Sequence, residues 1–278
     1  MLSYRHSFHS GNHADLLKHL LLLAVLQKFA EKDKAVSYID SHSGAGLYDL
    51  LSANALMNAE HETGIARLWQ QNLTDPLLQR YLACVESVNQ DGQLHFYPGS
   101  PFVAQWALRA QDRLHLLDLQ QAEIDALRHY CGQDARVSIH QRDAFEGLLA
   151  LTPPEPRRGM VLIDPSYEDK ADYQRVVSTV RKLHHRWPVG VIAIWYPLLG
   201  KARDRGQWLK ASLQRENLNA LSSYELCVAP QSEEFGMYGS GMLVVNTPWQ
   251  TQTVMQNALE EALPLLNPEA KLLIATHS

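Results

Sequence analysis

The sequence predicts an α/β protein with a doubly wound, Rossmann-like sheet and a small helical insertion. Three observations predict this fold. Short β-rich runs alternate with helix-like segments, acidic residues directly follow several of these runs, and a G-x-G loop follows the first run. Ligands of open α/β sheets bind at the carboxyl ends of the strands. We therefore expect a ligand site where the acidic residues gather.

The first third of the chain is predicted to contain a buried helix, a strand and the insertion. The helix is expected over about 15–31, and its apolar run at 20–26 is too short to span a bilayer. The strand is expected over about 36–40. Two later segments have 3.6-residue apolar spacing with no strand between them, which breaks the βαβ rhythm. The predicted division is a Rossmann-like domain of residues 1–51 and 97–278 with an inserted helical subdomain of residues 52–96.

The alternation of strands and helices resumes after Pro101. Each strand is expected from a short run rich in β-branched and apolar residues, and each helix from apolar residues spaced by three and four. Helices are expected up to Ala110 and over 121–131, 170–186 and 202–215; strands are expected over 113–118, 136–140, 159–163, 190–195, 221–229 and 241–246, with a final edge near 272–275.

The loop after the first strand begins with Asp40 and contains Gly44 and Gly46. Glycines in this position let the backbone approach a nucleotide-like ligand. The third glycine of a dinucleotide fingerprint is absent, because Asp49 stands there, and a carboxylate would repel a pyrophosphate. The loop therefore favours an adenosyl ligand without phosphates.

The next two strands also end in carboxylates. Asp118 closes the second predicted strand, where an acidic group suits a ribose diol. Asp143 and Ala144 follow the third strand, where a carboxylate and a backbone N–H can bind the edge of adenine. Each aspartate alone is more often a helix N-cap than a ligand contact. Their shared position at strand ends favours the ligand site.

The segment Asp164-Pro165-Ser166-Tyr167 follows a buried strand and combines a carboxylate, a fixed carbonyl and an aromatic ring. Proline fixes its own φ, so the direction of its carbonyl is set by the turn. The carboxylate and carbonyl can accept hydrogen bonds from an exocyclic amine while the ring stacks on the base. The segment thus indicates a site for a planar NH2 group, although Asp-Pro by itself is a common turn signal.

Composition narrows the class of protein. The chain has 278 residues and three cysteines without a C-x-x-C pair, which favours the cytoplasm. Its formal net charge of −5 is unusual for an RNA-binding protein. Positive charge is instead local: Arg5, Lys18 and several histidines surround one acid, Asp15, and Tyr4 and Phe8 lie among them as nucleotide-stacking rings do.

Several long motifs resemble one bacterial family, the RlmJ family of S-adenosylmethionine-dependent methyltransferases that modify adenine N6 in 23S ribosomal RNA. The N-terminal block is the most specific of these motifs, and the resemblance runs nearly end to end. The motifs are Met1 to His19, Asp40-Ser-His42-Ser-Gly-Ala-Gly46, Tyr97-Pro-Gly99-Ser100-Pro101, Asp164-Pro-Ser-Tyr167 and Trp195-Tyr-Pro197.

The resemblance implies a Rossmann-like methyltransferase fold, S-adenosylmethionine as cofactor and 23S ribosomal RNA, protein-free or partly assembled, as substrate. It implies no metal and no membrane. The catalytic residues that it implies are Asp164, Pro165 and Tyr167; the cofactor contacts are Lys18, His19, His42, Ser100, Asp118, Asp143, Ala144 and Asp164; the substrate contacts are Tyr4, His6 and Tyr167.

This chain departs from the family pattern at three of these motifs. Ser166 stands where the family usually has a second proline, so the loop loses one fixed φ. Asp118 replaces a glutamate, which shortens the ribose contact by one methylene. Ala144 replaces a glycine, which is harmless if only its backbone N–H is used.

Three alternatives remain open at the level of sequence. His9, His13 and His19 could form a metal site, although Gly11-Asn12 disfavours the helix that would align the first two. A non-catalytic RNA-binding module would keep the aromatic N-terminus but would have no use for the acidic cofactor edge. A methyltransferase acting on DNA or on a protein glutamine amide would use a similar Asp-Pro loop.

Overall fold

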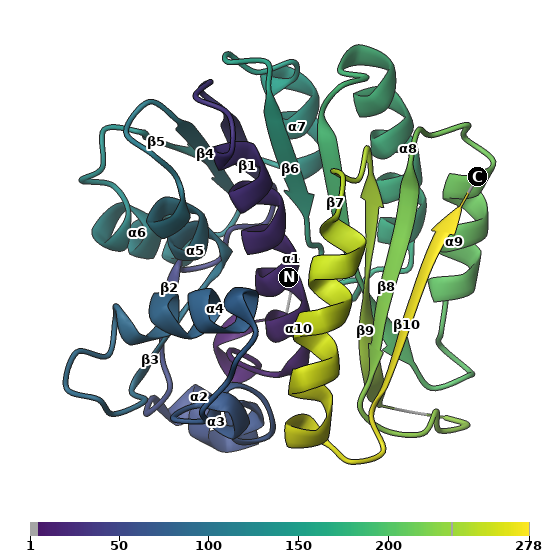
Figure 1. The fold of residues 1–278 in the computed structure, drawn as a ribbon. Helices are drawn as coiled ribbons and strands as arrows, with labels where there is room; N and C mark the ends of the chain where they lie inside the picture. Colours follow the sequence, from purple (N-terminus) through teal and green to yellow (C-terminus); the bar gives the residue numbers. More distant parts are fainter. Residues whose placement is uncertain (1–4, 235, 278) are drawn as a thin grey trace.

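The computed structural model describes residues 5–234 and 236–277, and these build an eight-stranded sheet covered by helices on both faces (Figure 1). The strand order is β10-β8-β9-β7-β6-β1-β4-β5. The strands from β7 to β5 are parallel, and β9, β8 and β10 continue the sheet antiparallel to their neighbours. The predicted α/β fold with a mostly parallel core is confirmed.

Most predicted elements are present, with boundaries shifted by a few residues. The strands are β1 Ser37–Asp40, β2 Leu47–Asp49, β3 Phe96–Pro98, β4 Arg113–Asp118, β5 Val137–Gln141, β6 Gly159–Ile163, β7 Val191–Leu199, β8 Leu221–Cys227, β9 Met237–Val245 and β10 Lys271–His277. The helices are η1 His6–Phe8, α1 His13–Ala30, α2 Ala53–Asn58, η2 Glu60–Thr63, α3 Ile65–Leu68, α4 Pro76–Glu86, α5 Ser100–Ala107, α6 Gln121–Tyr130, α7 Ala144–Leu151, α8 Ala171–Arg186, α9 Gly206–Gln214 and α10 Thr251–Leu266.

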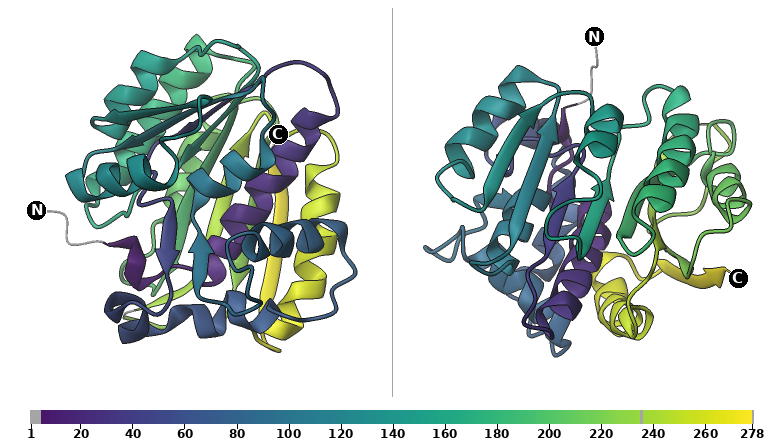
Figure 2. Two further views of the ribbon diagram at one scale, coloured as in Figure 1. Left: turned by 90° about the vertical axis from the view of Figure 1, so that its left-hand side faces the viewer. Right: turned by 90° about the horizontal axis from the view of Figure 1, so that it is seen from above.

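The sheet separates two hydrophobic cores. Helices α1, α4, α5, α6 and α10 pack on one face, and α7, α8 and α9 pack on the other (Figure 2). Because successive strand residues point to opposite faces, Tyr38 belongs to the first core and its neighbour Ile39 to the second. The central strand β1 is therefore buried on both sides, as a parallel strand between two helical layers must be.

Helix α1 is the buried helix predicted from its apolar run. Asn12 caps it by accepting hydrogen bonds from the backbone N–H groups of Ala14 and Asp15 at 2.9 and 3.1 Å. Every residue from Leu20 to Leu26 is buried, because α4, α5, α10 and strand β9 surround the helix. Among the described residues, no helix is long and apolar enough to cross a membrane.

Three structures were missed in the sequence. Helix α7 lies between β5 and β6, helix α10 precedes β10, and β2 pairs with β3 in a separate two-stranded ribbon. Helix α7 is only eight residues long and contains Gly147, and α10 contains Pro264, and in a sequence both features count against a helix. The ribbon joins residues about 50 positions apart, which no local pattern reveals.

The residues between β2 and β3 form α2, η2, α3 and α4 and dock on the N-terminal segment. Ile65 donates its backbone N–H to the carbonyl oxygen of Gly11 at 2.8 Å. Glu60 accepts a hydrogen bond from Asn12 at 2.8 Å and lies 2.7 Å from Nδ1 of His9. The segment that leads into α1 is therefore held from outside the sheet.

Gly64→Ala should weaken this docking. A Cβ at Gly64 would lie 2.0 Å from the backbone oxygen of Gly11, so we expect the free energy of unfolding in urea to fall by about 1–3 kcal/mol. Gly92→Ala is the matched control, because its Cβ meets nothing within 4 Å and only the positive φ of 78° costs about 1 kcal/mol. Equal losses in the two variants would contradict the steric argument.

Candidate active site

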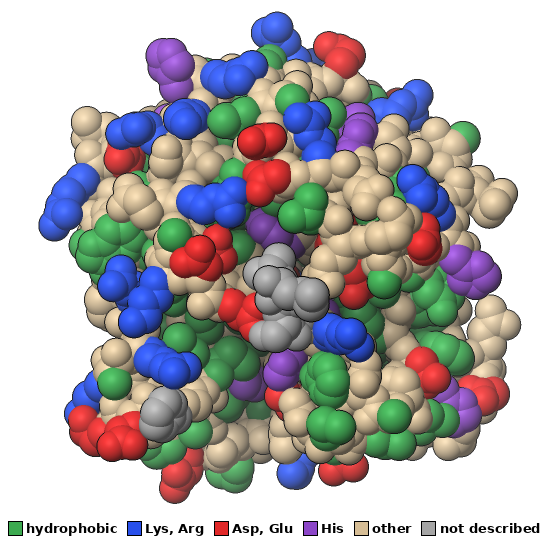
Figure 3. All heavy atoms as spheres, turned by 180° about the vertical axis from the view of Figure 1, so that it is seen from behind, with side chains coloured by type: hydrophobic (Ala, Val, Ile, Leu, Met, Phe, Trp, Pro, Cys, Tyr) green, Lys and Arg blue, Asp and Glu red, His purple; other side chains and the backbone are tan. Residues whose placement is uncertain are grey.

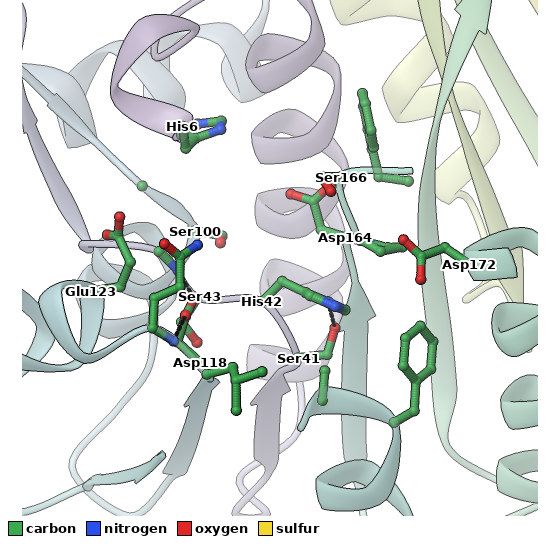
Figure 4. A pocket seen from close by; sticks show the side chains of 18 of the residues that line it. His6, Ser41, His42, Ser43, Ser100, Asp118, Glu123, Asp164, Ser166 and Asp172 are labelled. Atoms are coloured by element: carbon green, nitrogen blue, oxygen red, sulfur yellow. Dashed lines mark hydrogen bonds between the residues drawn. The ribbon is translucent and has the colours of Figure 1, made fainter. Parts of the chain in front are cut away.

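One pocket lies at the carboxyl ends of the parallel strands, where the sequence placed the ligand site. Figure 4 shows His42 near its centre, Asp118, Ser100 and Glu123 on one side, and Asp164 and Asp172 on the other. The lining residues are His6, Lys18, Ser41, His42, Ser43, Gly44, Tyr48, Gly99, Ser100, Asp118, Leu119, Gln120, Glu123, Asp143, Ala144, Phe145, Asp164, Pro165, Ser166, Asp169, Asp172, Arg175 and Trp195.

The glycine loop after β1 holds the carboxylate at the end of β4. Gly44 has a φ of +59° and donates its backbone N–H to Oδ2 of Asp118 at 3.0 Å. Gln120 donates its N–H to Oδ1 of the same residue at 2.9 Å. A Cβ on Gly44 would lie 2.2 Å from the hydroxyl of Tyr48, so both its conformation and its surroundings require glycine.

The end of β5 supplies an N-cap and an aromatic ring. Asp143 caps α7 by accepting the N–H of Glu146 at 3.1 Å, and Ala144 is the first residue of that helix. A helical backbone suits any residue, so alanine in place of the family's glycine introduces no strain. The His42 ring packs edge-on against Phe145 with 5.7 Å between centroids, and burial lowers the pKa of His42.

A buried chain of charges holds Asp164. Nζ of Lys18 donates to Oδ2 of Asp164 at 2.7 Å and lies 2.8 Å from Oδ1 of Asp15. The other oxygen of Asp15 accepts the N–H of Gly11 at 2.9 Å and lies 3.0 Å from Nε2 of His6. The chain connects the N-terminal segment, α1 and the loop after β6.

These contacts fix the charge states of Asp15 and Lys18. Burial alone would lower the pKa of Lys18, but Asp15 and Asp164 override it and raise that pKa well above its usual range. Burial would likewise raise the pKa of Asp15, and the opposing effects of His6 and Lys18 hold it well below its usual range. Both side chains are therefore charged at neutral pH.

In the loop after Asp164, Tyr167 packs near Trp195, which lines the pocket. Tyr167 has a φ of +55° and is 7% exposed, and its hydroxyl donates to the backbone oxygen of Trp195 at 2.8 Å. Its ring packs on Tyr173 at 4.4 Å between centroids. Pro165, Ser166 and Trp195 line the pocket, and Tyr167 is absent from the lining. Its predicted stacking role stays a prediction.

His19 also lies outside the pocket lining. It is fully buried, and its Nδ1 lies 2.9 Å from the hydroxyl of Tyr97. Contact between His19 and a cofactor stays a prediction. Of the other two predicted substrate contacts, His6 lines the pocket and Tyr4 lies outside the described residues.

The three histidines weighed as a metal site have separate surroundings. His9 pairs with Glu60, burial lowers the pKa of His13 to about 4, and His19 contacts Tyr97. Within residues 5–234 and 236–277, no group of three or more His, Cys, Asp or Glu side chains could hold a metal ion.

Sequence reasoning assigned no role to several residues that line the pocket, among them Glu123, Phe145, Arg175 and Trp195. Phe145 directly follows Ala144, and Trp195 begins the motif Trp195-Tyr-Pro197, so their neighbours in the sequence could have pointed to both. Glu123 lies in the first turn of α6 and Arg175 on α8, and only the packing of these helices brings them to the site.

The sheet and the pocket at its carboxyl edge define an α/β protein with a Rossmann-like ligand site. The family model described as "Ribosomal RNA large subunit methyltransferase D, RlmJ" matches residues 33–270, and the chain belongs to this family. The resemblance inferred from the motifs is confirmed.

Individual relatives agree with this family. The chain is 42% identical over 259 residues to "Ribosomal RNA large subunit methyltransferase J" of Escherichia coli, covering 93% of this chain and 92% of that protein. It is 39% identical over 270 residues to the protein of the same name from Haemophilus influenzae, covering 97% and 95%. A crystal structure of a Legionella pneumophila protein matches with a TM-score of 0.89 and 31% identity, over 97% of this chain and 99% of that one.

Lys18→Met should expose the dependence of the fold on the charge chain. At pH 7 we expect the free energy of unfolding to fall by about 3–5 kcal/mol, because the buried carboxylate of Asp15 and the partly buried carboxylate of Asp164 lose their cation. The pKa of Asp15 is depressed in the native protein, so its stabilisation is present above the unfolded-state pKa and is lost as the pH falls through the folded-state pKa. In the variant, protonation relieves the repulsion between the carboxylates.

The difference in the free energy of unfolding between the wild type and Lys18→Met should therefore become smaller when urea unfolding is repeated from pH 8 down to pH 5. Lys28→Met, which removes exposed contacts with Glu31 and Gln250, is the control and should cost little at any pH. A deficit that does not depend on pH would show that lost packing, and not unpaired charge, destabilises the variant.

His19→Gln should flatten the acid side of the stability profile. Burial lowers the pKa of His19 to about 3, below its ordinary value of 6.5, so the unfolded chain binds the proton first. Its contribution is therefore complete above pH 6.5 and is lost as the pH falls toward 3. Urea unfolding at steps from pH 7 to pH 4 measures the slope, and calorimetry with S-adenosylmethionine tests the predicted cofactor contact. An unchanged slope would contradict the neutral, buried state of His19.

Proposed function

We propose that this chain transfers the methyl group of S-adenosylmethionine to N6 of a specific adenosine in 23S ribosomal RNA. The observation that carries the proposal is the loop after β6, where Lys18 holds the Asp164 carboxylate beside Pro165 at the wall of the pocket. This arrangement offers two hydrogen-bond acceptors to a planar amine. The matched family and the names of the relatives support the same reaction.

The charge of the pocket fits the cofactor. Six carboxylic side chains line it against two permanently charged cations, Lys18 and Arg175. S-adenosylmethionine supplies a methyl group on a positively charged sulfonium, and a surplus of carboxylates favours such a ligand. The carboxylic residues are Asp118, Glu123, Asp143, Asp164, Asp169 and Asp172.

Residues at different strand ends are proposed to bind different parts of the cofactor. Asp118, held by Gly44 and Gln120, would accept hydrogen bonds from the ribose hydroxyls. Asp143 and the N–H of Ala144 would bind the adenine edge. Further cofactor contacts are proposed for Lys18, His19, His42, Ser100 and Asp164.

The reaction needs Asp164 as an acceptor. Adenine N6 is conjugated with its ring and is a poor nucleophile, so it must be held in line with the methyl group while its protons are bound. Lys18 fixes one oxygen of Asp164, and the remaining lone pairs and the Pro165 carbonyl accept from the amine. As positive charge develops on N6, Asp164 takes the released proton.

The target base must enter the pocket without the phosphates of the RNA backbone. An anionic pocket repels the RNA backbone, so the target adenosine has to be extruded from its stack and inserted alone. Figure 3 shows one face of the molecule, on which Lys and Arg side chains are scattered among Asp and Glu and several carboxylates lie close to the middle. Tyr4, His6 and Tyr167 are proposed to contact the extruded base.

We propose that the enzyme acts in the cytoplasm on RNA that is protein-free or partly assembled, because an extruded base needs an accessible strand. We further propose residues 52–96 as a helical subdomain inserted into the Rossmann-like domain of residues 1–51 and 97–278. The docking of Glu60 and Ile65 on the N-terminal segment supports a role in positioning His6.

Asp164→Asn tests the catalytic assignment. With unmodified 23S ribosomal RNA and S-adenosylmethionine, we expect N6-methyladenosine formation, measured by mass spectrometry, to fall at least about a hundredfold. The amide keeps the shape of the side chain but cannot take the proton. Retention of activity within a few-fold would refute the role of Asp164.

The wild-type enzyme should be assayed in parallel on naked 23S RNA, assembled large subunits, DNA and protein extracts. Product on naked RNA alone supports the proposal. Preference for assembled subunits would overturn the protein-free substrate, and methylation of DNA or protein alone would overturn the substrate class.

A further inference from the structure

Arg175 connects α8, the helix that follows the Asp164 loop, with the part of the pocket that is predicted to bind adenine. It lies in the second turn of α8, which begins a few residues after that loop. Its Nη2 donates to Oδ2 of Asp143 at 2.8 Å, and its Cζ lies 4.2 Å from the centroid of the Phe145 ring. Nη1 lies 3.6 Å from Oδ1 of Asp172 on its own helix.

These contacts immobilise Asp143. Its Oδ1 accepts the backbone N–H of Glu146 at 3.1 Å, and its Oδ2 accepts from Arg175. A carboxylate anchored at both oxygens cannot rotate, so its remaining lone pairs keep a fixed direction. Burial would raise the pKa of Asp143, but the contacts with Arg175 and the backbone N–H of Glu146 together lower it, which keeps the group an acceptor.

The same guanidinium holds the neighbouring ring. Phe145 contacts both the guanidinium of Arg175 and the edge-on ring of His42. A groove lined by Phe145, Leu149 and Ser178 runs between α7 and α8 beside it. The two helices therefore do not close over the ring, and the guanidinium forms that part of the wall.

We propose that Arg175 is a positioning residue for the adenine ring of the cofactor, acting through Asp143 and Phe145. The proposal rests on the proposed use of S-adenosylmethionine. Arg175 does not touch the methyl group or the target amine in this scheme. It sets the direction of the carboxylate that binds the exocyclic amine of the cofactor and the position of the adjoining ring.

The test is Arg175→Ala, with Arg181→Ala as the matched control on the same helix, where Arg181 has only a distant surface pair with Glu216 at 3.9 Å. Calorimetry should show that Arg175→Ala raises the Kd for S-adenosylmethionine roughly tenfold, the loss expected for one charge-assisted hydrogen bond. Arg181→Ala should leave it unchanged. At saturating cofactor, kcat on 23S RNA should stay within about twofold while KM for the cofactor rises.

A ligand fragment separates positioning from simple electrostatics. 5′-Methylthioadenosine carries the adenine and ribose but no sulfonium and no amino acid. Its Kd should rise at least as much as that of S-adenosylmethionine in Arg175→Ala, because the loss of a cation offsets part of the defect only for a positively charged ligand. An unchanged Kd for the fragment would overturn the adenine assignment.

Other outcomes distinguish the two proposals. If the wild-type protein does not bind S-adenosylmethionine, the proposed cofactor fails. If the wild type binds it and Arg175→Ala binds it equally well, only the role of Arg175 fails. A fall in melting temperature of Arg175→Ala that matches the loss of affinity would assign the residue to the fold and likewise overturn the proposal.

Discussion

The buried ammonium of Lys18 is the constraint on which the site depends. A lysine that is 5% exposed is tolerated only where carboxylates surround it, and here Asp15 and Asp164 do so. Asp15 must in turn be held, and Gly11 and His6 hold it. The start of α1 and the loop after β6 are therefore a single electrostatic unit, although 146 residues separate Lys18 from Asp164.

This unit explains why the apolar helix α1 lies beside the sheet at its centre. Its apolar run packs into one core, and its first turns bring Asp15 and Lys18 to the carboxyl edge of β6. The segment from η2 to α3 then holds the residues before α1 through Gly11, Asn12 and His9. The packing of α1, the contacts that hold its first residues and its charged side chains therefore all help to fix the position of the Asp164 carboxylate.

The strand ends were predictable because each ends an apolar run with a polar residue, and Asp118, Asp143 and Asp164 do line one pocket. The cofactor edge could thus be located from sequence. Tyr167 could not be placed, because its positive φ and its hydrogen bond to the backbone of Trp195 depend on how β7 packs. Arg175 could not be predicted as a site residue for a similar reason, since only the packing of α7 on α8 brings it to Asp143. Gly147 in α7 and Pro264 in α10 likewise count against a helix in the sequence, although both segments fold as helices.

The surplus of carboxylates in the pocket has a consequence for turnover. In the proposed reaction, these carboxylates attract the positive sulfur of the cofactor, and that sulfur becomes neutral once its methyl group has moved to the base. The proton released by the amine would at the same time reduce the negative charge at Asp164. Under the proposed function, the chemical step therefore removes one electrostatic contribution to the binding of its own cofactor.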